Sequence, residues 1–507
     1  MSMFLIWRKS LMSKHDFRGG VLIENPYPLN QLSVVEVPPP KKAIYLLKQR
    51  EGASAKPKVK VGQKVKVGQV IAVSNNDYCV PMHSSISGVV SAIDDQPIAH
   101  SSGLKVPSIS IESDGKDDWI SLKGCGEEVD KCTPDEIIEK IRNAGIVGMG
   151  GAGFPAHVKI KGAQGAKTII INATECDPAT LCDDALMRKY PEEIIKGIEV
   201  LMYACQSQKA IIAVEEDKVD AIIKLNQTIK NKNICVEAVP IKYSTGAEKL
   251  LIKLLLDKVI PTGSFASSSG VLCQNIATVK AIYDAVVIGK PLVSRIVTVN
   301  GSALKNPSNY EVRIGSSFSD IVKKSKPSAN PHEIRVGGMM MGVDVPDKNY
   351  SICKITSSII VDEIKIKQKE SACIRCSKCN EVCPINLLPQ QLFWFCKSDN
   401  TKKASSYDLQ DCIECGCCSY VCPSHIPLVE YFQYGKALVK KELREQELAA
   451  KSRERYEFKE FRLDRIKQER DKMMAEKKAA LKAKMAKEKD NKAKIAEALK
   501  RVNDKKK

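Results

Sequence analysis

Two cysteine runs of the same spacing are the part of this sequence most able to do chemistry. The first begins at residue 373 and the second 39 residues later, and each reads C-x2-C-x2-C-x3-C-P. In bacterial two-cluster proteins this pattern holds [4Fe–4S] clusters, and the fourth cysteine of each run ligates the other cluster. The spacing therefore predicts two such clusters. Their ligand sets would be Cys373, Cys376, Cys379 and Cys422 for one, and Cys412, Cys415, Cys418 and Cys383 for the other.

Structural zinc is the main alternative for cysteines of this kind. Zinc sites bind four ligands, commonly two from each C-x2-C pair. A third cysteine at the same spacing, followed by Cys-Pro and present twice, does not match a four-ligand site, so we favour iron and sulfide. Two further cysteines lie nearby. Cys417 interrupts the spacing and is interpreted as a spare thiol, and Cys396 as a core residue.

Length and composition limit the class of protein. A chain of 507 residues is too long for one hydrophobic core and predicts several domains. The eleven cysteines outside the two runs follow no disulfide framework, which indicates a reducing compartment. No apolar run approaches the roughly 18–20 residues that a membrane helix needs. We therefore expect no transmembrane segment, and docking on other subunits if the protein works at a membrane.

The positive charge lies mostly at the C-terminal end. Residues 440–507 contribute +11 of the formal net charge of +19. Apolar residues in this stretch are too sparse for a sustained coiled-coil seam, so a solvated helix is expected. Its basic residues are expected to touch anionic lipid or a protein partner rather than nucleic acid, because the chemistry upstream is redox chemistry.

Local patterns predict a multidomain α+β chain. The helix that starts at Thr133-Pro134 has a capping box, and helices at 191–205 and 218–229 alternate with strands at 168–173, 210–214 and 234–239, which predicts a parallel sheet. One predicted domain is a barrel of the biotinyl/lipoyl type. Lipoyl domains carry an acceptor lysine on one hairpin, but the corresponding hairpin here has no lysine, so we expect this barrel to act as a scaffold. The predicted domains are an N-terminal extension (1–40), a biotinyl/lipoyl-like barrel-sandwich domain (41–118), an α/β domain (119–290), a β-rich module (291–345), a ferredoxin-type α-helical module (367–430) and a charged helical tail (431–507).

A glycine-rich loop at residues 148–155 is the second candidate site. It matches G-x-G-x-x-G, but a dinucleotide fingerprint follows a strand, and here a helix precedes it. Two interpretations stay open: a flexible linker, or a backbone cradle for a ligand. The next strand ends in Asn172, Glu175 and Asp177, at the edge where open α/β sheets bind ligands, and this favours the cradle.

Several of these motifs resemble one known family. The glycine loop with Lys159, the N-x-x-E-x-D-P motif at 172–178, the Y-x-x-G-x-E motif at 243–248 and Gln274-Asn275 are similar to motifs of the NADH-oxidising subunit of respiratory complex I. Thr174 and Ala247 stand where that subunit has acids. With the barrel, the Phe17-Arg18-Gly19-Gly20 segment and the cysteine runs, residues 15–430 resemble the C subunit of the Rnf-type ion-translocating oxidoreductase, also called the Rsx electron transport complex.

The resemblance implies a flavin and nicotinamide site and a β-grasp module at 291–345. Glu175 and Asp177 would be catalytic. Residues implied to bind FMN or NADH are Gly148, Gly150, Gly151, Gly153, Phe154, Lys159, Asn172, Tyr243, Gly246, Glu248 and Asn275.

The resemblance also implies a place in the cell. The chain would be a peripheral subunit at the cytoplasmic face of the bacterial inner membrane. It would pass electrons from NADH or ferredoxin, through flavin and two clusters, to integral-membrane and other redox subunits of the same complex. The alternative is an electron carrier that holds the clusters but no nucleotide.

Overall fold

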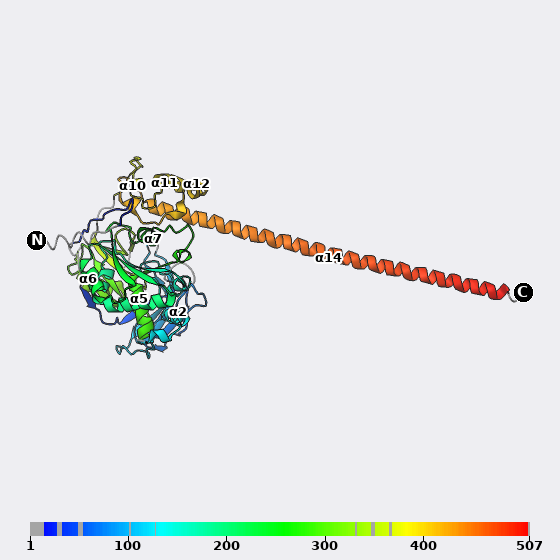
Figure 1. The fold of residues 1–507 in the computed structure, drawn as a ribbon, viewed down its shortest axis with the longest axis horizontal. Coiled ribbons are helices and arrows are strands. Elements are labelled where there is room, and N and C mark those ends of the chain that lie inside the picture. Colours follow the sequence, from blue (N-terminus) through cyan, green and yellow to red (C-terminus); the bar gives the residue numbers. More distant parts are fainter. Residues whose placement is uncertain are drawn as a thin grey trace. The chain divides into compact units, whose positions relative to one another are not determined.

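A computed structural model describes residues 15–27, 33–48, 54–100, 103–126, 128–329, 332–345, 350–364 and 368–504 (Figure 1). The chain divides into two units, Met1–Gln433 and Tyr434–Lys507. All the strands described below belong to the first unit.

The barrel consists of two small antiparallel sheets whose apolar side chains meet in one core. The larger sheet has the order β2-β8-β7-β4 and the smaller β3-β5-β6. Ile71, Ile86, Ile109 and Ile111 are fully buried between them. The bounds are β2 Lys42–Leu46, β3 Lys56–Pro57, β4 Lys64–Val65, β5 Val70–Val73, β6 Met82–His83, β7 Gly88–Pro97 and β8 Lys105–Ser113.

The α/β domain has a four-stranded parallel sheet of order β11-β10-β9-β12. Side chains of β9 alternate between two cores: Ile169 and Ile171 pack on one face, and Ile170 packs on the other. Successive residues of a strand point to opposite faces, so a strand of consecutive isoleucines must be covered on both sides. The strands are β9 Thr168–Ala173, β10 Lys209–Glu215, β11 Ile234–Val239 and β12 Val271–Asn275.

Helices cover both faces of this sheet. The predicted capping box is present, since the Thr133 hydroxyl accepts from the backbone N–H of Glu136 and the Glu136 carboxylate accepts from the N–H of Thr133. The bounds are η1 Val129–Lys131, α2 Pro134–Asn143, α3 Ala156–Lys161, α4 Cys182–Lys189, α5 Pro191–Cys205, α6 Val219–Thr228, α7 Glu248–Leu256, η2 Ala266–Ser269, α8 Ile276–Tyr283 and η3 Asp284–Ile288.

A six-stranded mixed sheet has the order β1-β14-β13-β17-β15-β16, and all of its strands except β1 follow the α/β domain in sequence. It reaches past the expected range 291–345 at both ends, because β1 pairs with its edge and β17 inserts at its centre. The apolar residues of β17 suit a central position that is buried on both faces. The elements are β1 Val34–Glu36, β13 Ser294–Asn300, β14 Ser308–Arg313, α9 Phe318–Lys324, β15 His332–Val336, β16 Val343–Val345 and β17 Ser358–Glu363.

The cysteine runs lie in a module of short helices. Leu392, Phe393 and Phe432 form its core, together with Cys396, as predicted for that residue. The helices are α10 Lys378–Glu381, α11 Pro389–Lys397, α12 Thr401–Ser406, η4 Leu409–Asp411, α13 Cys417–Tyr420 and α14 Leu428–Asp504.

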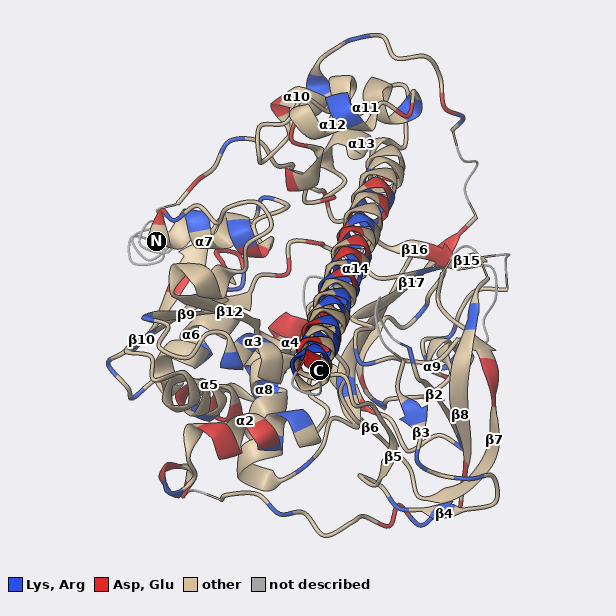
Figure 2. Ribbon diagram, turned by 90° about the vertical axis from the view of Figure 1, so that its right-hand side faces the viewer, with Lys and Arg blue, Asp and Glu red and all other residues tan. Residues whose placement is uncertain are grey.

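From Tyr434 to Asp504 the chain is a single helix with its side chains in solvent almost throughout. Basic and acidic residues alternate along it (Figure 2), and pairs such as Asp490–Lys494 and Glu497–Arg501 lie one turn apart, at 2.7 and 2.8 Å. Such pairs support an exposed helix. Across the described residues, no helix combines the length and the apolar character that a bilayer crossing requires.

Candidate functional site

The eight cysteines of the two runs surround two separate cavities. The run cysteines that line the first cavity are Cys373, Cys376, Cys379 and Cys422, and those that line the second are Cys383, Cys412, Cys415 and Cys418, with Cys417 as a fifth cysteine there. The fourth cysteine of each run thus faces the cavity formed by the first three cysteines of the other run.

Both cavities have the chemistry that a [4Fe–4S] cluster requires. Apolar side chains, among them Phe393 in the first cavity and Phe432 in the second, close each space beside the sulfur atoms. Burial raises the pKa of the Cys379 and Cys383 thiols, so thiolates gathered here need positive charge to stabilise them. The irons of a cluster supply that charge and take one cysteine thiolate each. The residues present therefore fit two clusters.

Residues 243–246 connect the second cavity to the α/β domain. The Cys417 thiol donates to the carbonyl oxygen of Tyr243 at 3.8 Å. The neighbouring polar groups of Cys417 and Ser244 lower the pKa of Cys415 to about 7. Cys417, interpreted from the sequence as a spare thiol, is therefore buried at the junction of the two modules.

Two glycines near the N-terminus, Gly19 and Gly20, lie against Cys383 and Tyr243. The N–H of Gly20 donates to the carbonyl of Val382 at 2.9 Å. A Cβ atom at Gly19 would lie 2.6 Å from the carbonyl oxygen of Cys383, and one at Gly20 would lie 2.6 Å from that of Tyr243. Both residues have positive φ, so glycine is required for conformation as well as for space. This segment holds Cys383 beside Tyr243.

The glycine loop is a closed hairpin with an open outer face. Gly148 donates to the Phe154 carbonyl at 2.7 Å, and Gly153 donates to the Gly148 carbonyl at 3.1 Å. A Cβ at Gly150 would lie 3.3 Å from Cβ of Asn275, whereas one at Gly151 would meet no atom within 4 Å. The backbone can therefore approach a ligand at Gly151. A loop of this kind fits a phosphate-bearing ligand such as FMN.

Asn172, at the end of β9, joins the sheet to residues 243–246. Its amide Nδ2 donates to the carbonyl of Gly246 at 2.8 Å, and its Oδ1 accepts from the hydroxyl of Thr174 at 2.7 Å. Gly246 donates to Sγ of Cys176 at 3.2 Å. The polar atoms of Asn172 thus hold the loop that leads to the second cavity.

Gly246→Ala is expected to destabilise the α/β domain by about 1–3 kcal/mol, as overpacking does. The new Cβ would lie 2.5 Å from Oγ1 of Thr174, which is held by its hydrogen bond to Asn172. Thermal unfolding measures the loss, and adding Thr174→Ala should recover part of it. Gly162→Ala is the matched control, because its Cβ would meet nothing closer than 3.4 Å. Equal losses in Gly246→Ala and Gly162→Ala would contradict the prediction.

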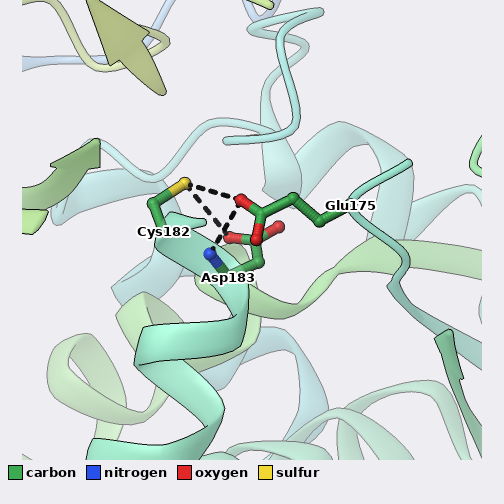
Figure 3. A group of neighbouring side chains, drawn as sticks. All are labelled: Glu175, Cys182 and Asp183. Carbon is green, nitrogen blue, oxygen red and sulfur yellow. Dashed lines mark hydrogen bonds between the residues drawn. The ribbon is translucent and has the colours of Figure 1, made fainter. Parts of the chain in front are cut away.

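Half-buried Glu175 lies beside buried Asp183 and Cys182, and the two acids form a close pair (Figure 3). The Glu175 carboxyl lies at the start of α4 and accepts from the backbone N–H groups of Asp183 and Asp184 at 3.0 and 3.2 Å, and from the Cys182 thiol at 3.3 Å. Burial and the nearby charge of Asp183 raise the pKa of Glu175 to about 8. This environment favours the protonated form of Glu175 near neutral pH.

Asn275 links this pair to the glycine loop. Its amide Nδ2 donates to Oδ2 of Asp183 at 2.7 Å, and its Oδ1 caps α8 by accepting from the N–H of Ala277. Burial also raises the pKa of Asp183. The sequence analysis did not single out Asp183 or Cys182, although two consecutive acids at a helix start, eight residues after a motif acid, were a usable signal.

Asp177 contacts the loop at residues 337–342. Its carboxylate accepts from the N–H groups of Ala179 and Met340, both at 3.1 Å. A Cβ at Gly338 would lie 2.2 Å from Oδ2 of Asp177. The side chain thus anchors the loop at residues 337–342, a contact that suits a positioning role better than direct contact with a substrate.

Lys159 and Glu248 are the remaining pair from the motifs. Lys159 lies on α3 and Glu248 begins α7, and Nζ and Oε2 are 2.5 Å apart. Both side chains are partly exposed. The structure therefore brings the glycine loop, Asn172, Glu175, Gly246, Glu248 and Asn275 to one end of the parallel sheet. Tyr243 lies at the border with the second cavity.

Three family models match successive parts of the chain. The RnfC barrel sandwich hybrid domain matches residues 15–116, and the Nuo51 FMN-binding domain matches residues 141–284. The 4Fe-4S dicluster domain matches residues 372–426. The chain accordingly carries an FMN-binding domain and a dicluster domain, and its cofactors are FMN and two [4Fe–4S] clusters.

Among similar proteins are three that are named as the C subunit of an ion-translocating oxidoreductase complex. The protein from Haemophilus influenzae (strain PittEE) is 39% identical over 89% of this chain and 70% of its own length. The Yersinia pestis bv. Antiqua protein is 39% identical, over 92% and 76%, and a Vibrio cholerae (El Tor Inaba) protein is 37% identical, over 90% and 60%. An NAD⁺-reducing [NiFe]-hydrogenase in the H2-reduced state is 18% identical, with a TM-score of 0.44 over 63% of this chain and 64% of that chain.

Proposed function

The chain belongs to the family of C subunits of ion-translocating oxidoreductase complexes, and we propose that it carries electrons from NADH to the membrane subunits of such a complex. It would be peripheral, at the cytoplasmic face of the bacterial inner membrane, while integral-membrane partners move the ion. FMN, when bound, accepts a hydride pair and releases single electrons, which is the conversion that clusters need. Ferredoxin remains the alternative donor.

The proposal assigns roles to the residues of the two sites. Each cluster is ligated by the four cysteines of the two runs that line the same cavity. Gly148, Gly150, Gly151 and Gly153 hold the phosphate-bearing cofactor, and Asn172, Gly246 and Asn275 keep the surrounding loops in place. Glu175 holds a proton at the buried end of the site. Asp177 positions the loop at residues 337–342.

The observation that carries the proposal is the contact made by residues 243–246. Gly246 is bound by Asn172 of the FMN-binding domain, whereas the carbonyl of Tyr243 accepts from the thiol of Cys417, which lines the second cavity. Among the described residues, the cysteines of the first cavity make no such hydrogen bond to the end of the parallel sheet. We therefore infer that the cluster of Cys383, Cys412, Cys415 and Cys418 receives electrons first, and that the other cluster passes them to a partner protein of the complex.

Two finer assignments complete the proposal. The six-stranded sheet with α9 is assigned as a β-grasp-like module that braces the FMN-binding domain, because β13 accepts a hydrogen bond from the segment before α4: the N–H of Leu181 donates to Oγ1 of Thr298 at 2.9 Å. The basic helix after Tyr434 is assigned to anionic lipid or to a partner protein.

Anaerobic purification followed by NADH addition tests this function. We expect about eight irons per chain, since each cluster holds four, together with FMN. NADH should bleach the flavin absorbance and then produce the EPR signals of reduced clusters. Protein whose clusters respond to dithionite but not to NADH, with no bound flavin, would instead support the carrier without a nucleotide.

A further inference from the structure

Two cysteines outside the cluster runs lie side by side just before α2. The Sγ atoms of Cys125 and Cys132 are 2.6 Å apart, and both side chains are partly exposed. Neither residue lines a cluster cavity. We call Cys125 and Cys132 the dithiol pair. It is separate from the cluster ligands, and small molecules in solution can reach it.

Two helices hold the backbone of the dithiol pair in place. The N–H of Cys125 donates to the carbonyl of Val286, in η3, at 2.7 Å. The hydroxyl of Tyr203, on α5, donates to the carbonyls of Asp130 and Cys132 at 3.3 and 3.0 Å. A disulfide can form only where two cysteines are already close and correctly directed. Because each cysteine is anchored separately, the fold itself keeps the two thiols together.

A metal ion is the main alternative for two neighbouring thiols. Structural zinc takes four protein ligands, and the dithiol pair offers two. Within the part of the chain that the structure describes, the one group of three or more ligand atoms close enough to share an ion is Glu175, Cys182 and Asp183. The arrangement at Cys125 and Cys132 therefore favours thiol oxidation over metal binding.

A surface groove runs beside the dithiol pair. Gly126 and Asp130 line it from the segment between the two cysteines, and Lys196 and Tyr203 line it from α5. Lys196 and Asp130 are both exposed, so the groove carries both signs of charge. A short zwitterionic peptide with its own sulfur, such as glutathione, matches these charges. The groove gives such a molecule access to the thiols.

We propose that the dithiol pair is a modification site that exchanges with low-molecular-weight disulfides and closes to an intramolecular disulfide, which stabilises the segment before α2. In a reducing compartment, which the cysteine composition indicates, the pair is open. It closes when the pool of small thiols becomes oxidised. The closed form fixes the start of α2, the helix that leads to the glycine loop.

The exchange starts at Cys132. Burial, and next the hydrogen bond with Cys132, raise the pKa of the Cys125 thiol to about 11, so Cys125 is protonated at neutral pH. The Cys132 thiolate attacks one sulfur of glutathione disulfide, forms a mixed disulfide and releases one glutathione. Cys132 then no longer raises the pKa of Cys125, whose sulfur attacks that of Cys132 and releases the second glutathione. Two protein thiols are oxidised, and their protons pass through water to the two glutathione thiols.

Peptide mapping of the full chain, loaded with FMN and clusters and kept anaerobic, tests the site. The protein is incubated with mixtures of reduced and oxidised glutathione, quenched with acid, alkylated and digested with trypsin. Cleavage after Lys131 places Cys125 and Cys132 on separate peptides, residues 124–131 and 132–140. We expect mass spectrometry to find these peptides joined as the share of oxidised glutathione rises. Excess reduced glutathione should separate them again.

Thermal unfolding measures the effect of closure. The disulfide should raise the Tm by about 5 °C, as the cross-linking of a short loop does in a domain of this size. Cys125→Ser should abolish that rise and should stop at a stable mixed disulfide on Cys132. Cys235→Ser is the matched control, because Cys235 of β11 is also partly exposed but its thiol donates to the carbonyl of Ala210, at 3.8 Å. This variant should form the cross-link and show the rise in Tm.

The wild-type protein alone can overturn the proposal. Thiols that both remain open to alkylation at every glutathione ratio would do so, and so would a reaction that ends at the mixed disulfide. A cross-link that leaves the Tm unchanged would overturn the stabilising role. If Cys125→Ser does not fold, the peptide map of the wild type decides the site by itself.

Discussion

Cys412→Ala combined with Cys415→Ala should remove one cluster and leave the other. The double variant deletes two of the four thiolates assigned to the cluster of the second cavity, too many for a four-iron cluster to remain. Iron should fall from about eight atoms per chain to about four, because each cluster holds four irons. NADH should still bleach the flavin, but the remaining cluster should no longer be reduced by NADH, since its proposed donor is gone.

Cys396→Ala combined with Cys417→Ala is the matched control. Both cysteines are buried in the same module, and neither belongs to a four-cysteine set. Cys417 also lines the second cavity, so this control tests whether Cys415 or Cys417 is the ligand. Full iron content and two EPR signals are expected. Loss of a cluster in the control, with retention in the first variant, would show that the assigned ligand set is wrong.

Replacing Glu175 with glutamine should slow NADH-driven flavin reduction about 100-fold or more, the range found for positioned acids and bases. The neutral Glu175 carboxyl lies beside buried Asp183 and can supply a proton, which an amide cannot. In the wild type, the rate should fall as the pH rises through about 8, the pKa of Glu175. The variant should lose that step while both clusters assemble. Stopped-flow absorbance across roughly pH 6–9, which brackets this pKa, measures both effects.

The same pKa predicts how stability changes with pH. In the folded protein Glu175 keeps its proton up to about pH 8, whereas the ordinary value is 4.5. Between these values the folded state binds one proton more than the unfolded state, so this group makes stability fall as pH rises. Glu175→Gln should flatten that slope in thermal unfolding. Glu192→Gln, at the first turn of α5, should leave both the rate and the slope unchanged; a matching effect there would contradict the assignment.

Local elements were readable from the sequence because their determinants are local. Strand β9 occupies the predicted range, and α5 begins and ends at the predicted residues. The capping box at Thr133 needs only residues within one helical turn. The expected bounds of the β-rich module were too narrow, because β1 and β17 join its sheet from outside that range. Strand pairing between distant segments leaves no local signal.

Some of the site residues could also be predicted from the sequence, whereas the partners of others are visible only in the structure. Cysteine spacing alone predicted eight ligands, because a cluster demands thiolates at fixed intervals. Only the tertiary structure decided which partners the other motif residues have. Asp177 anchors a loop 163 residues away in sequence, at Met340, and Asn172 holds Gly246. Burial raised the pKa of Glu175, and the type of a residue does not say how deeply the fold will bury it.

The sequence by itself determined the redox chemistry of this protein, since ligand type and spacing are written in consecutive residues. The tertiary structure decided how that chemistry is connected. It placed Ser244 beside Cys415, and Tyr78 of the barrel beside Phe154. These contacts join segments that are far apart in the chain, and they exist only once apolar cores have brought the domains together.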